Sequence, residues 1–295
     1  MVKPATKREA VEHLQEKFGF SLRRGCGLIG IQRSSFYHKG KPSNDGPLRE
    51  ALRDLAARYR RWGCETLTEL LRRDGWTDNH KRIYRVYREE GLQVKRRKKR
   101  KTAKWRGESL EQPSRVNELW AMDFLSDQLA DGRRLKVLGV IDVYTRECLW
   151  LEVDSSLTGE RVVRVMCELA EKRGLPAKIM MDNGPEFTGR AMDRWAFEHG
   201  VHLHFIEPGK PMQNGYVEAF NSTLRDQCLN ENWFIGLADT KEILEAWRQL
   251  YNEVKPHRSL GRKTPSEYAA EQSKLASKNN VEQLHDDCKN CECRP

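Results

Sequence analysis

The stretch Asp182-Asn-Gly-Pro-Glu-Phe187 marks the end of one predicted strand and the start of a tight turn. The apolar run 177–181 precedes it and has the length of a buried strand. Asn183-Gly184 then allows an abrupt turn, so we expect the Asp182 side chain at the mouth of a sheet. Thirty-five residues separate Asp182 from Glu218, which falls in the first turn of a predicted helix. Two such carboxylates, joined by a third, could hold a pair of divalent metal ions over a phosphodiester.

The region around this stretch alternates strands and helices. Strands are predicted over residues 117–127, 135–144, 148–153, 177–181 and 201–206. Helices are predicted over residues 158–173, 188–199, 214–229 and 240–253. Three strands in a meander followed by alternating helices and strands predict an α/β domain, a mixed sheet flanked by helices, over residues 116–272. This order matches the ribonuclease-H-like fold.

Charge is distributed unevenly along the 295 residues, whose net charge is +10. Residues 1–110 contain 29 Lys and Arg against 13 Asp and Glu, whereas residues 111–295 contain 24 against 30. A basic front half suits phosphate-backbone binding, and a mildly acidic back half suits metal binding. No apolar run approaches the roughly 18 residues of a membrane span, and the N-terminus lacks the apolar core of a signal peptide.

The cysteines suggest a reducing compartment. Five are scattered singly through predicted elements, and we expect them to be free thiols: Cys26, Cys64, Cys148, Cys167 and Cys228. Three more crowd the predicted polar tail, residues 273–295: Cys288, Cys291 and Cys293. These three could bind a soft metal, but with no fourth ligand nearby a structural zinc site is disfavoured.

Two small helical units are predicted before the α/β domain, over residues 1–44 and 45–94. In the first, Ser21 is a plausible N-cap, Gly30 offers a turn and a short helix begins near Gln32, as in a helix-turn-helix. The second has three helical patterns, the last opening after Asn79. The predicted DNA contacts on these units are Arg33, Ser34, Ser35, Lys81, Arg82 and Arg85. The alternatives are a helical hairpin without DNA contact and ordinary solvated arginine faces.

Residues 95–115 are predicted to be a basic linker. Seven consecutive cations, residues 95–101, repel one another and cannot form a core. An arm that becomes ordered along DNA is favoured over a simple tether. Its predicted phosphate contacts are Lys95, Arg96, Arg97, Lys98, Lys99 and Arg100.

The predicted helix around Glu218 is amphipathic. Its polar face carries Glu218, Asn221, Ser222 and Arg225 at offsets 0, 3, 4 and 7. Its apolar face carries Val217, Phe220, Leu224 and Cys228. A helix buried on the apolar side would aim Glu218 and its polar neighbours at one region; the alternative is a solvated face. Asn221 and Arg225 are therefore candidate DNA contacts, as are His257 and Arg258 in a predicted basic loop with two prolines, residues 255–268.

Two acids compete for the third carboxylate. Asp123 lies between Met122 and Phe124 in one predicted strand, and Asp142 lies between Ile141 and Val143 in another. An acid in apolar surroundings is costly unless it has a partner, and this applies equally to both. Periodicity alone does not choose between them.

Three segments resemble the signatures of the retroviral-integrase-like transposases: Trp120-Ala-Met-Asp123-Phe124, Asp182-Asn-Gly-Pro-Glu-Phe187 and Asn214-Gly-Tyr-Val-Glu218-Ala-Phe-Asn-Ser222. The 35 intervening residues equal the spacing of that superfamily's Asp-Asp-(35)-Glu triad. Matches extend over roughly residues 5–270, among them Tyr251-Asn, Pro256-His-Arg-Ser-Leu260 and Thr264-Pro265. Together they resemble the second-open-reading-frame transposase of the third insertion-sequence family.

This resemblance implies a function and a set of site residues. Asp123, Asp182 and Glu218 would be the catalytic ligands of Mg²⁺, with Mn²⁺ able to substitute, while Asp142 and Glu186 would be fold or second-layer acids. The enzyme would bind the terminal inverted repeats of a mobile element, cleave to expose 3′-hydroxyls and join these to target DNA.

The resemblance also implies partners and a location. A homodimer or larger assembly on paired ends is expected, in a bacterial, nucleoid-associated cytoplasmic setting and away from membranes. Such chains are often fused by frameshift to an upstream DNA-binding partner. The competing functions are a metal-dependent nuclease without strand transfer and a DNA-binding regulator on a relic nuclease fold.

Overall fold

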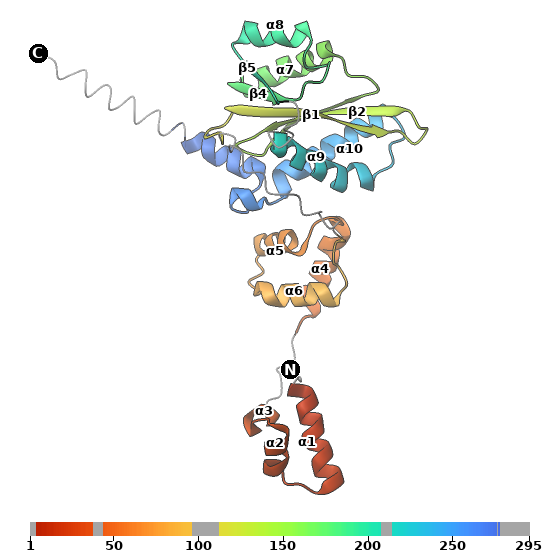
Figure 1. Cartoon of the computed structure of the whole chain (residues 1–295), viewed down its shortest axis with the longest axis vertical. Helices are drawn as coiled ribbons and strands as arrows, with labels where there is room; N and C mark the ends of the chain where they lie inside the picture. Colours follow the sequence, from red (N-terminus) through yellow and green to blue (C-terminus); the bar gives the residue numbers. More distant parts are fainter. Residues whose placement is uncertain (1–3, 38–43, 96–111, 208–213, 276, 278–295) are drawn as a thin grey trace, which may run out of the picture. The chain divides into compact units, whose positions relative to one another are not determined.

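The computed structural model describes residues 4–37, 44–95, 112–207, 214–275 and 277 (Figure 1). These residues fall into two compact units, Met1–Leu48 and Arg49–Pro295. The predicted Cys288, Cys291 and Cys293 cluster and the linker cations from Arg96 to Arg100 lie outside the described residues. Each unit is therefore taken by itself.

The first unit contains three short helices, α1 (Pro4–Phe18), α2 (Leu22–Ile29) and α3 (Arg33–Tyr37). The Ser21 hydroxyl accepts a hydrogen bond from the Arg24 N–H at 3.4 Å, as expected of an N-cap. Gly30 ends α2 with φ of 65°, a left-handed conformation that glycine adopts without steric cost. The predicted punctuation of a helix-turn-helix is thus present in the structure.

The second unit begins with three helices, α4 (Gly46–Arg58), α5 (Cys64–Arg73) and α6 (His80–Glu89). The Asn79 side chain accepts from the Lys81 N–H at 3.0 Å and caps α6, as its position in the sequence predicts. The helices bury an apolar side each, which includes Leu52, Leu67, Leu71, Ile83 and Val86.

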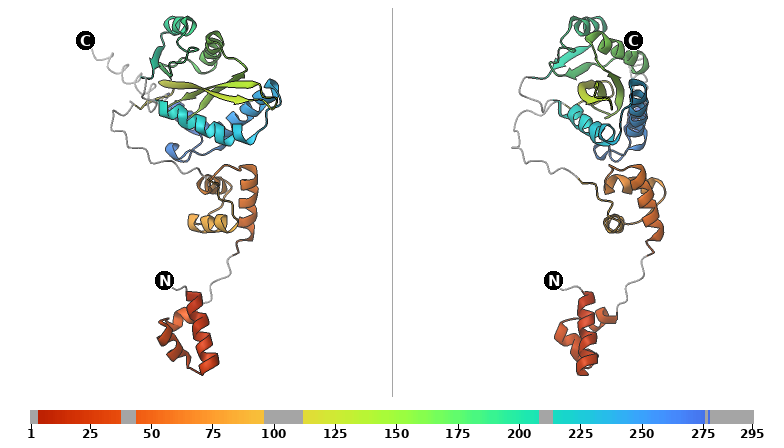
Figure 2. Two further views of the ribbon diagram at one scale, coloured as in Figure 1. Left: turned by 45° about the vertical axis from the view of Figure 1, so that its right-hand side comes forward. Right: turned by 90° about the vertical axis from the view of Figure 1, so that its right-hand side faces the viewer.

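A five-stranded mixed sheet forms the centre of the α/β domain (Figures 1 and 2). Its strands are β1 (Leu119–Gln128), β2 (Arg134–Asp142), β3 (Cys148–Asp154), β4 (Lys178–Met181) and β5 (His202–Phe205), in the order β3-β2-β1-β4-β5. The first three strands pair antiparallel; β4 runs parallel to β1, and β5 runs parallel to β4. The predicted α/β class, a mixed sheet flanked by helices, is confirmed.

Helices cover both faces of this sheet (Figure 1). Helices α7 (Gly159–Arg173) and α8 (Arg190–His199) cover one face, and α9 (Gly215–Gln227) and α10 (Leu237–Gln249) cover the other. Side chains alternate along β1, so Trp120 and Met122 pack on the α7–α8 side whereas Ala121 and Leu125 pack on the α9–α10 side. Residue parity along each strand therefore decides which layer receives a side chain.

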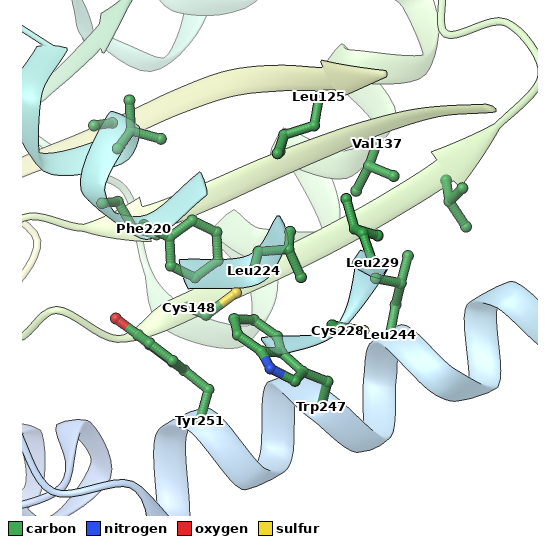
Figure 3. Close-up of a cluster of buried hydrophobic side chains, with 14 of the residues drawn as sticks. Leu125, Val137, Cys148, Phe220, Leu224, Cys228, Leu229, Leu244, Trp247 and Tyr251 are labelled. Atoms are coloured by element: carbon green, nitrogen blue, oxygen red, sulfur yellow. The ribbon is translucent and has the colours of Figure 1, made fainter. Parts of the chain in front are cut away.

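An aromatic cluster fixes α9 and α10 to the sheet (Figure 3). The ring centroids of Phe220, Trp247 and Tyr251 lie 5.1–5.8 Å apart in pairs. A Cβ atom at Gly139 on β2 would come within 3.1 Å of the Phe220 ring. Glycine at this position therefore lets α9 approach the sheet closely, a common reason for glycine within a strand.

One prediction at the C-terminal side was wrong. The sequence segment 255–268 was expected to be a loop, but residues 265–275 are helical. The Thr264 hydroxyl accepts from the Glu267 N–H at 3.2 Å, and the Glu267 carboxylate accepts from the Thr264 N–H at 2.8 Å. This reciprocal pair is a capping box, and Pro265 stands at the first helical position, where a missing N–H costs nothing.

Two compositional expectations can also be compared with the structure. The five scattered cysteines are free, and Cys26, Cys148 and Cys228 are buried. Within the described ranges, no helix has the length and apolar character needed to cross a membrane.

Candidate active site

Asp123 and Asp182 lie side by side at the carboxyl end of two parallel strands. In the β1–β4 ladder, Ala121 pairs with Met180. Asp123 and Asp182 each follow two residues later, so strand parity directs both toward the face that Ala121 and Met180 share, under α9. Both acids are half-buried. The tight turn that Asn183-Gly184 was expected to provide follows directly.

Helix α9 brings Glu218 to the same region. Val217, Phe220 and Leu224 are buried against the sheet, which leaves Glu218 exposed on the polar side. The pKa of Asp123 is raised to about 6, first by burial and further by the negative charges of Asp182 and Glu218. Asp123 therefore lies within electrostatic reach of both other carboxylates.

Asp123 is held by two donors. The Phe124 N–H donates to Asp123 Oδ1 at 2.8 Å, and the Asn221 amide donates to Asp123 Oδ2 at 2.8 Å. Asn221 Oδ1 is buried and accepts no hydrogen bond within the described protein. Asn221, a predicted DNA contact, is 8 % exposed, and its amide orients Asp123.

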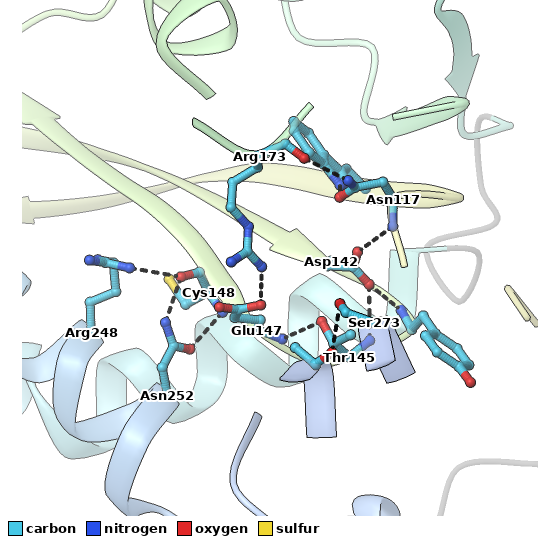
Figure 4. A network of polar contacts seen from close by, with 12 residues as sticks. Asn117, Asp142, Thr145, Glu147, Cys148, Arg173, Arg248, Asn252 and Ser273 are labelled. Carbon is cyan, nitrogen blue, oxygen red and sulfur yellow. Dashed lines mark hydrogen bonds and ion pairs between the residues drawn. The ribbon is translucent and has the colours of Figure 1, made fainter. Parts of the chain in front are cut away.

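Asp142 has quite different surroundings (Figure 4). Its Oδ1 accepts from the N–H groups of Tyr144 and Thr145 at 2.8 and 2.9 Å, and its Oδ2 accepts from the Asn117 N–H at 2.9 Å. It is fully buried, and burial raises its pKa against the effect of these donors. The groups that shift the pKa of Asp142 are its burial and its donors on Asn117, Tyr144 and Thr145, and neither Asp182 nor Glu218 is among them. Of the two competing acids, the structure therefore brings Asp123 to the pair.

The turn after β4 contributes further contacts. The Gly184 N–H donates to Asp182 Oδ1 at 3.0 Å, and the Asn183 amide donates to the Ile206 carbonyl at 2.8 Å. A Cβ at Gly184 would come within 2.9 Å of Asp182 Oδ1, so the turn requires glycine there. Glu186 pairs with Lys136, which holds the pKa of Glu186 below its usual value.

Sequence reasoning did not identify two residues near this site. Gly139 is the cross-strand partner of Asp123, and its missing Cβ makes room for Phe220 and Asn221. A glycine inside an otherwise apolar strand is the signal that could have indicated it. Lys136 pairs with Glu186, 50 residues away in the sequence, and no local sequence pattern predicts such a pair.

The predicted DNA contacts on the catalytic domain are placed as follows. Arg225 donates to the Ser126 carbonyl at 2.7 Å and lies 3.8 Å from an Asp127 oxygen, and its side chain is 43 % exposed. The His257 ring packs edge-to-face on Tyr251 at 4.8 Å, and burial lowers its pKa to about 3. A neutral, packed imidazole does not suit a phosphate contact. Arg258 is exposed in a short 3-10 helix, Arg258–Leu260.

The predicted contacts on the helical units differ in accessibility. Arg33 and Ser34 are exposed on α3, whereas Ser35 is half-buried and its carbonyl accepts from Arg8 at 3.0 Å. Lys81 and Lys95 are exposed. Arg82 pairs with Asp78 at 2.7 Å, and Arg85 pairs with Glu89 at 2.9 Å. Arg96, Arg97, Lys98, Lys99 and Arg100 lie beyond the described residues.

No group of three or more Asp, Glu, His or Cys side chains in the described ranges already surrounds a metal position. Asp123 and Asp182 lie on the α9 side of the sheet, and Asp123 feels the charges of both Asp182 and Glu218. They supply hard oxygen donors of the kind that Mg²⁺ prefers. Their chemistry, though not a finished coordination shell, therefore fits a divalent cation.

Comparison with protein families identifies a protein class that agrees with the fold and with the positions of the three acids. Residues 113–211 and 199–265 match the integrase core domain, and residues 43–100 match an HTH-like domain. The fold, with its strand-borne acids and the glutamate on α9, is thus that of an integrase-core enzyme, a polynucleotidyl transferase class.

Relatives in insertion elements narrow this class. The 31.7 kDa protein of insertion element IS407 from Burkholderia multivorans is 45 % identical over 87 % of this chain and 93 % of its own length. The 39.2 kDa protein of insertion element IS476 from Xanthomonas euvesicatoria is 42 % identical over 90 % of this chain and 78 % of its own. The protein named putative transposase InsK, of element IS150 from Escherichia coli, is 25 % identical over 81 % of this chain and 89 % of its own length. The chain belongs to the insertion-element transposase family with an integrase core, as the sequence predicted.

Proposed function

We propose that this chain binds the terminal inverted repeats of its insertion sequence, cleaves there to expose 3′-hydroxyls, and joins them to target DNA by transesterification. The observation that carries this proposal is the convergence of Asp123, Asp182 and Glu218 on one face, where Asp123 feels both other charges. Three acids so placed repel one another without a cation, which is costly for a purely structural cluster.

Asp123, Asp182 and Glu218 would hold Mg²⁺, with Mn²⁺ able to substitute. The raised pKa of Asp123 is a feature that a nearby cation would relieve. When bound, divalent metal neutralises phosphate charge and activates the attacking oxygen. The residues present therefore fit the cofactor.

The protein's own residues would orient the reacting groups. Asn221 and the Phe124 N–H hold both oxygens of Asp123, and the Asx-type bond from Gly184 holds Asp182. Arg225, two turns beyond Glu218 on α9, keeps 43 % of its side chain exposed and would contact phosphate beside the acids. Fixed acids and an adjacent guanidinium position DNA without reorganisation during the reaction.

DNA would be held by the basic front half. Arg33 and Ser34 on α3 would read the element's ends, while Lys81 and the linker cations 95–101 would track phosphates. Chemistry at two ends calls for a homodimer or larger assembly, in the bacterial cytoplasm at the nucleoid. An upstream-frame protein is a further candidate partner.

The test uses the full chain and labelled DNA carrying one element end. Asp182→Asn should abolish Mg²⁺-dependent cleavage and leave end-binding within about twofold, because the amide removes a ligand charge without changing shape. The exposed Asp131→Asn variant, on the β1–β2 turn, is the matched control. Unchanged cleavage by Asp182→Asn would overturn the site.

Joining is tested separately with a precut end that already bears a 3′-hydroxyl. Covalent products with target DNA are expected from the unaltered chain and not from Asp182→Asn. Cleavage without joining would instead identify a metal-dependent nuclease.

A further inference from the structure

A cluster of one ion pair and two aromatic rings lies on the α7–α8 side of the sheet, next to the turn that carries Asp182. Lys136 on β2 pairs with Glu186, and its Nζ lies 4.4 Å from the centroid of the Phe124 ring. Phe124 stacks on the fully buried Phe187, with ring centroids 4.7 Å apart and planes at 17°. Since β1 lies between β2 and β4, the Lys136 side chain crosses β1 to reach the turn that follows β4.

The same turn carries Asp182. The Phe187 and Thr188 N–H groups donate to the Gly184 carbonyl at 3.0 and 3.1 Å, and the Gly184 N–H donates to Asp182. A Cβ at Gly184 would be 2.9 Å from Asp182 Oδ1 and 3.3 Å from Glu186 Oε2, so both carboxylates flank one glycine. Residues 182–188 thus form one hydrogen-bonded unit with Asp182 at its start and Glu186 near its end.

Several contacts fix this unit on the α7–α8 side, among them the close approach of the Glu186 carbonyl to Gly159 at the start of α7. The Asn183 amide ties it to the Ile206 carbonyl, and the Phe124–Phe187 stack anchors its end. The Lys136–Glu186 pair adds a charged link to a central strand, with side chains only 28 % and 22 % exposed. A partly buried, charge-assisted pair restrains geometry more strongly than an exposed one.

We propose that Lys136 and Glu186 are positioning residues, an ion pair bridging β1 that holds the Asp182 turn in the orientation needed for catalysis. This rests on the proposed role of Asp182. Neither residue needs to touch DNA or metal for this role. A displacement of about 1 Å at a catalytic group can cost about 100-fold in rate, so an ion pair that clamps the neighbouring turn can matter.

The experiment compares four variants of the full chain: Lys136→Met, Glu186→Gln, Lys136→Arg, and the exchanged pair Lys136→Glu with Glu186→Lys. Arg133→Met is the matched control, because Arg133 also pairs with an acid on the β1–β2 hairpin but has a 68 % exposed side chain. Amide hydrogen exchange of Gly184, Phe187 and Thr188 is measured without metal or DNA. End cleavage then gives kcat and the KM for DNA.

Lys136→Met and Glu186→Gln should each raise exchange at the three amides about tenfold and lower kcat about tenfold, with KM within about twofold. Lys136→Arg should retain wild-type values, and the exchanged pair should recover most of the loss. Arg133→Met should change neither. The conservative and exchanged variants keep the test decisive if a single substitution impairs folding.

Two results would overturn the clamp. A raised KM in Lys136→Met and in the exchanged pair, with unchanged exchange, would make Lys136 a DNA contact. Unchanged exchange in Glu186→Gln would show that the turn does not depend on the pair. Because hydrogen exchange requires no DNA chemistry, it tests the clamp even if cleavage by the chain proves absent.

Discussion

Asp123 and Asp142 stand on neighbouring antiparallel strands, each between two apolar residues, yet their surroundings differ in kind. Three backbone N–H groups satisfy Asp142, and none of its neighbours is one of the other two candidate acids. Asp123 has an amide and one N–H, and it faces the charges of Asp182 and Glu218. A buried acid whose oxygens all accept hydrogen bonds can serve the fold, whereas an acid close to other negative charges is a candidate for metal binding.

The largest expected difference between these two acids is in catalysis. Asp123→Asn should lower DNA cleavage by at least about 10³-fold, since charge stabilisation by bound metal contributes several kcal/mol. Its melting temperature in metal-free buffer should not fall, because the amide relieves repulsion with Asp182 and Glu218. The Asn221 amide can also turn its Oδ1, which has no donor, toward the new NH₂ group, whereas the backbone donors to Asp142 cannot turn. Cleavage by Asp142→Asn, compared per folded molecule, should remain within about threefold. If Asp142→Asn lost more cleavage than Asp123→Asn, Asp142 and not Asp123 would be the third ligand.

The second difference is in stability. Asp142→Asn should reduce the free energy of unfolding by about 2 kcal/mol. Each Asp142 oxygen accepts from a backbone N–H group, so the NH₂ group that replaces one oxygen would face a donor. Denaturant titration of the full chain measures this loss. A comparable loss in Asp123→Asn would remove the contrast between the two sites.

The smallest difference is in pH dependence without metal. The pKa of Asp123 rises from 3.8 to about 6, so between these values the folded chain binds more protons than the unfolded chain. Stability should therefore fall as pH rises from about 4 to about 6. The contribution of Asp123 is the difference between the wild-type and Asp123→Asn melting curves in EDTA. Added Mg²⁺ should restore stability to the wild-type chain above pH 6. If the melting temperatures of the wild-type chain and Asp123→Asn changed with pH in the same way in EDTA, the site would be contradicted.

Much of the fold was predictable because local signals were strong. Ser21 and Asn79 cap the helices that they were expected to cap, and alternating apolar runs gave the strands. The helix over residues 265–275 was missed although Thr264 and Glu267 have the spacing of a capping box. Pro256 and Pro265 favoured a loop, but a proline at the first helical position is compatible with a helix.

The sequence by itself determined the family, the strand carrying Asp182 and the helix face carrying Glu218, because these depend on motif spacing and short-range periodicity. Its periodicity did not choose between Asp123 and Asp142, for which only the family resemblance favoured Asp123, and it gave no sign of the Lys136–Glu186 pair. Those depend on sheet order and register: β1 pairs with β4, which puts Asp123 beside Asp182, and Gly139 lets α9 close over them. Contacts between distant segments exist only once the strands are paired, so only the tertiary structure decided them.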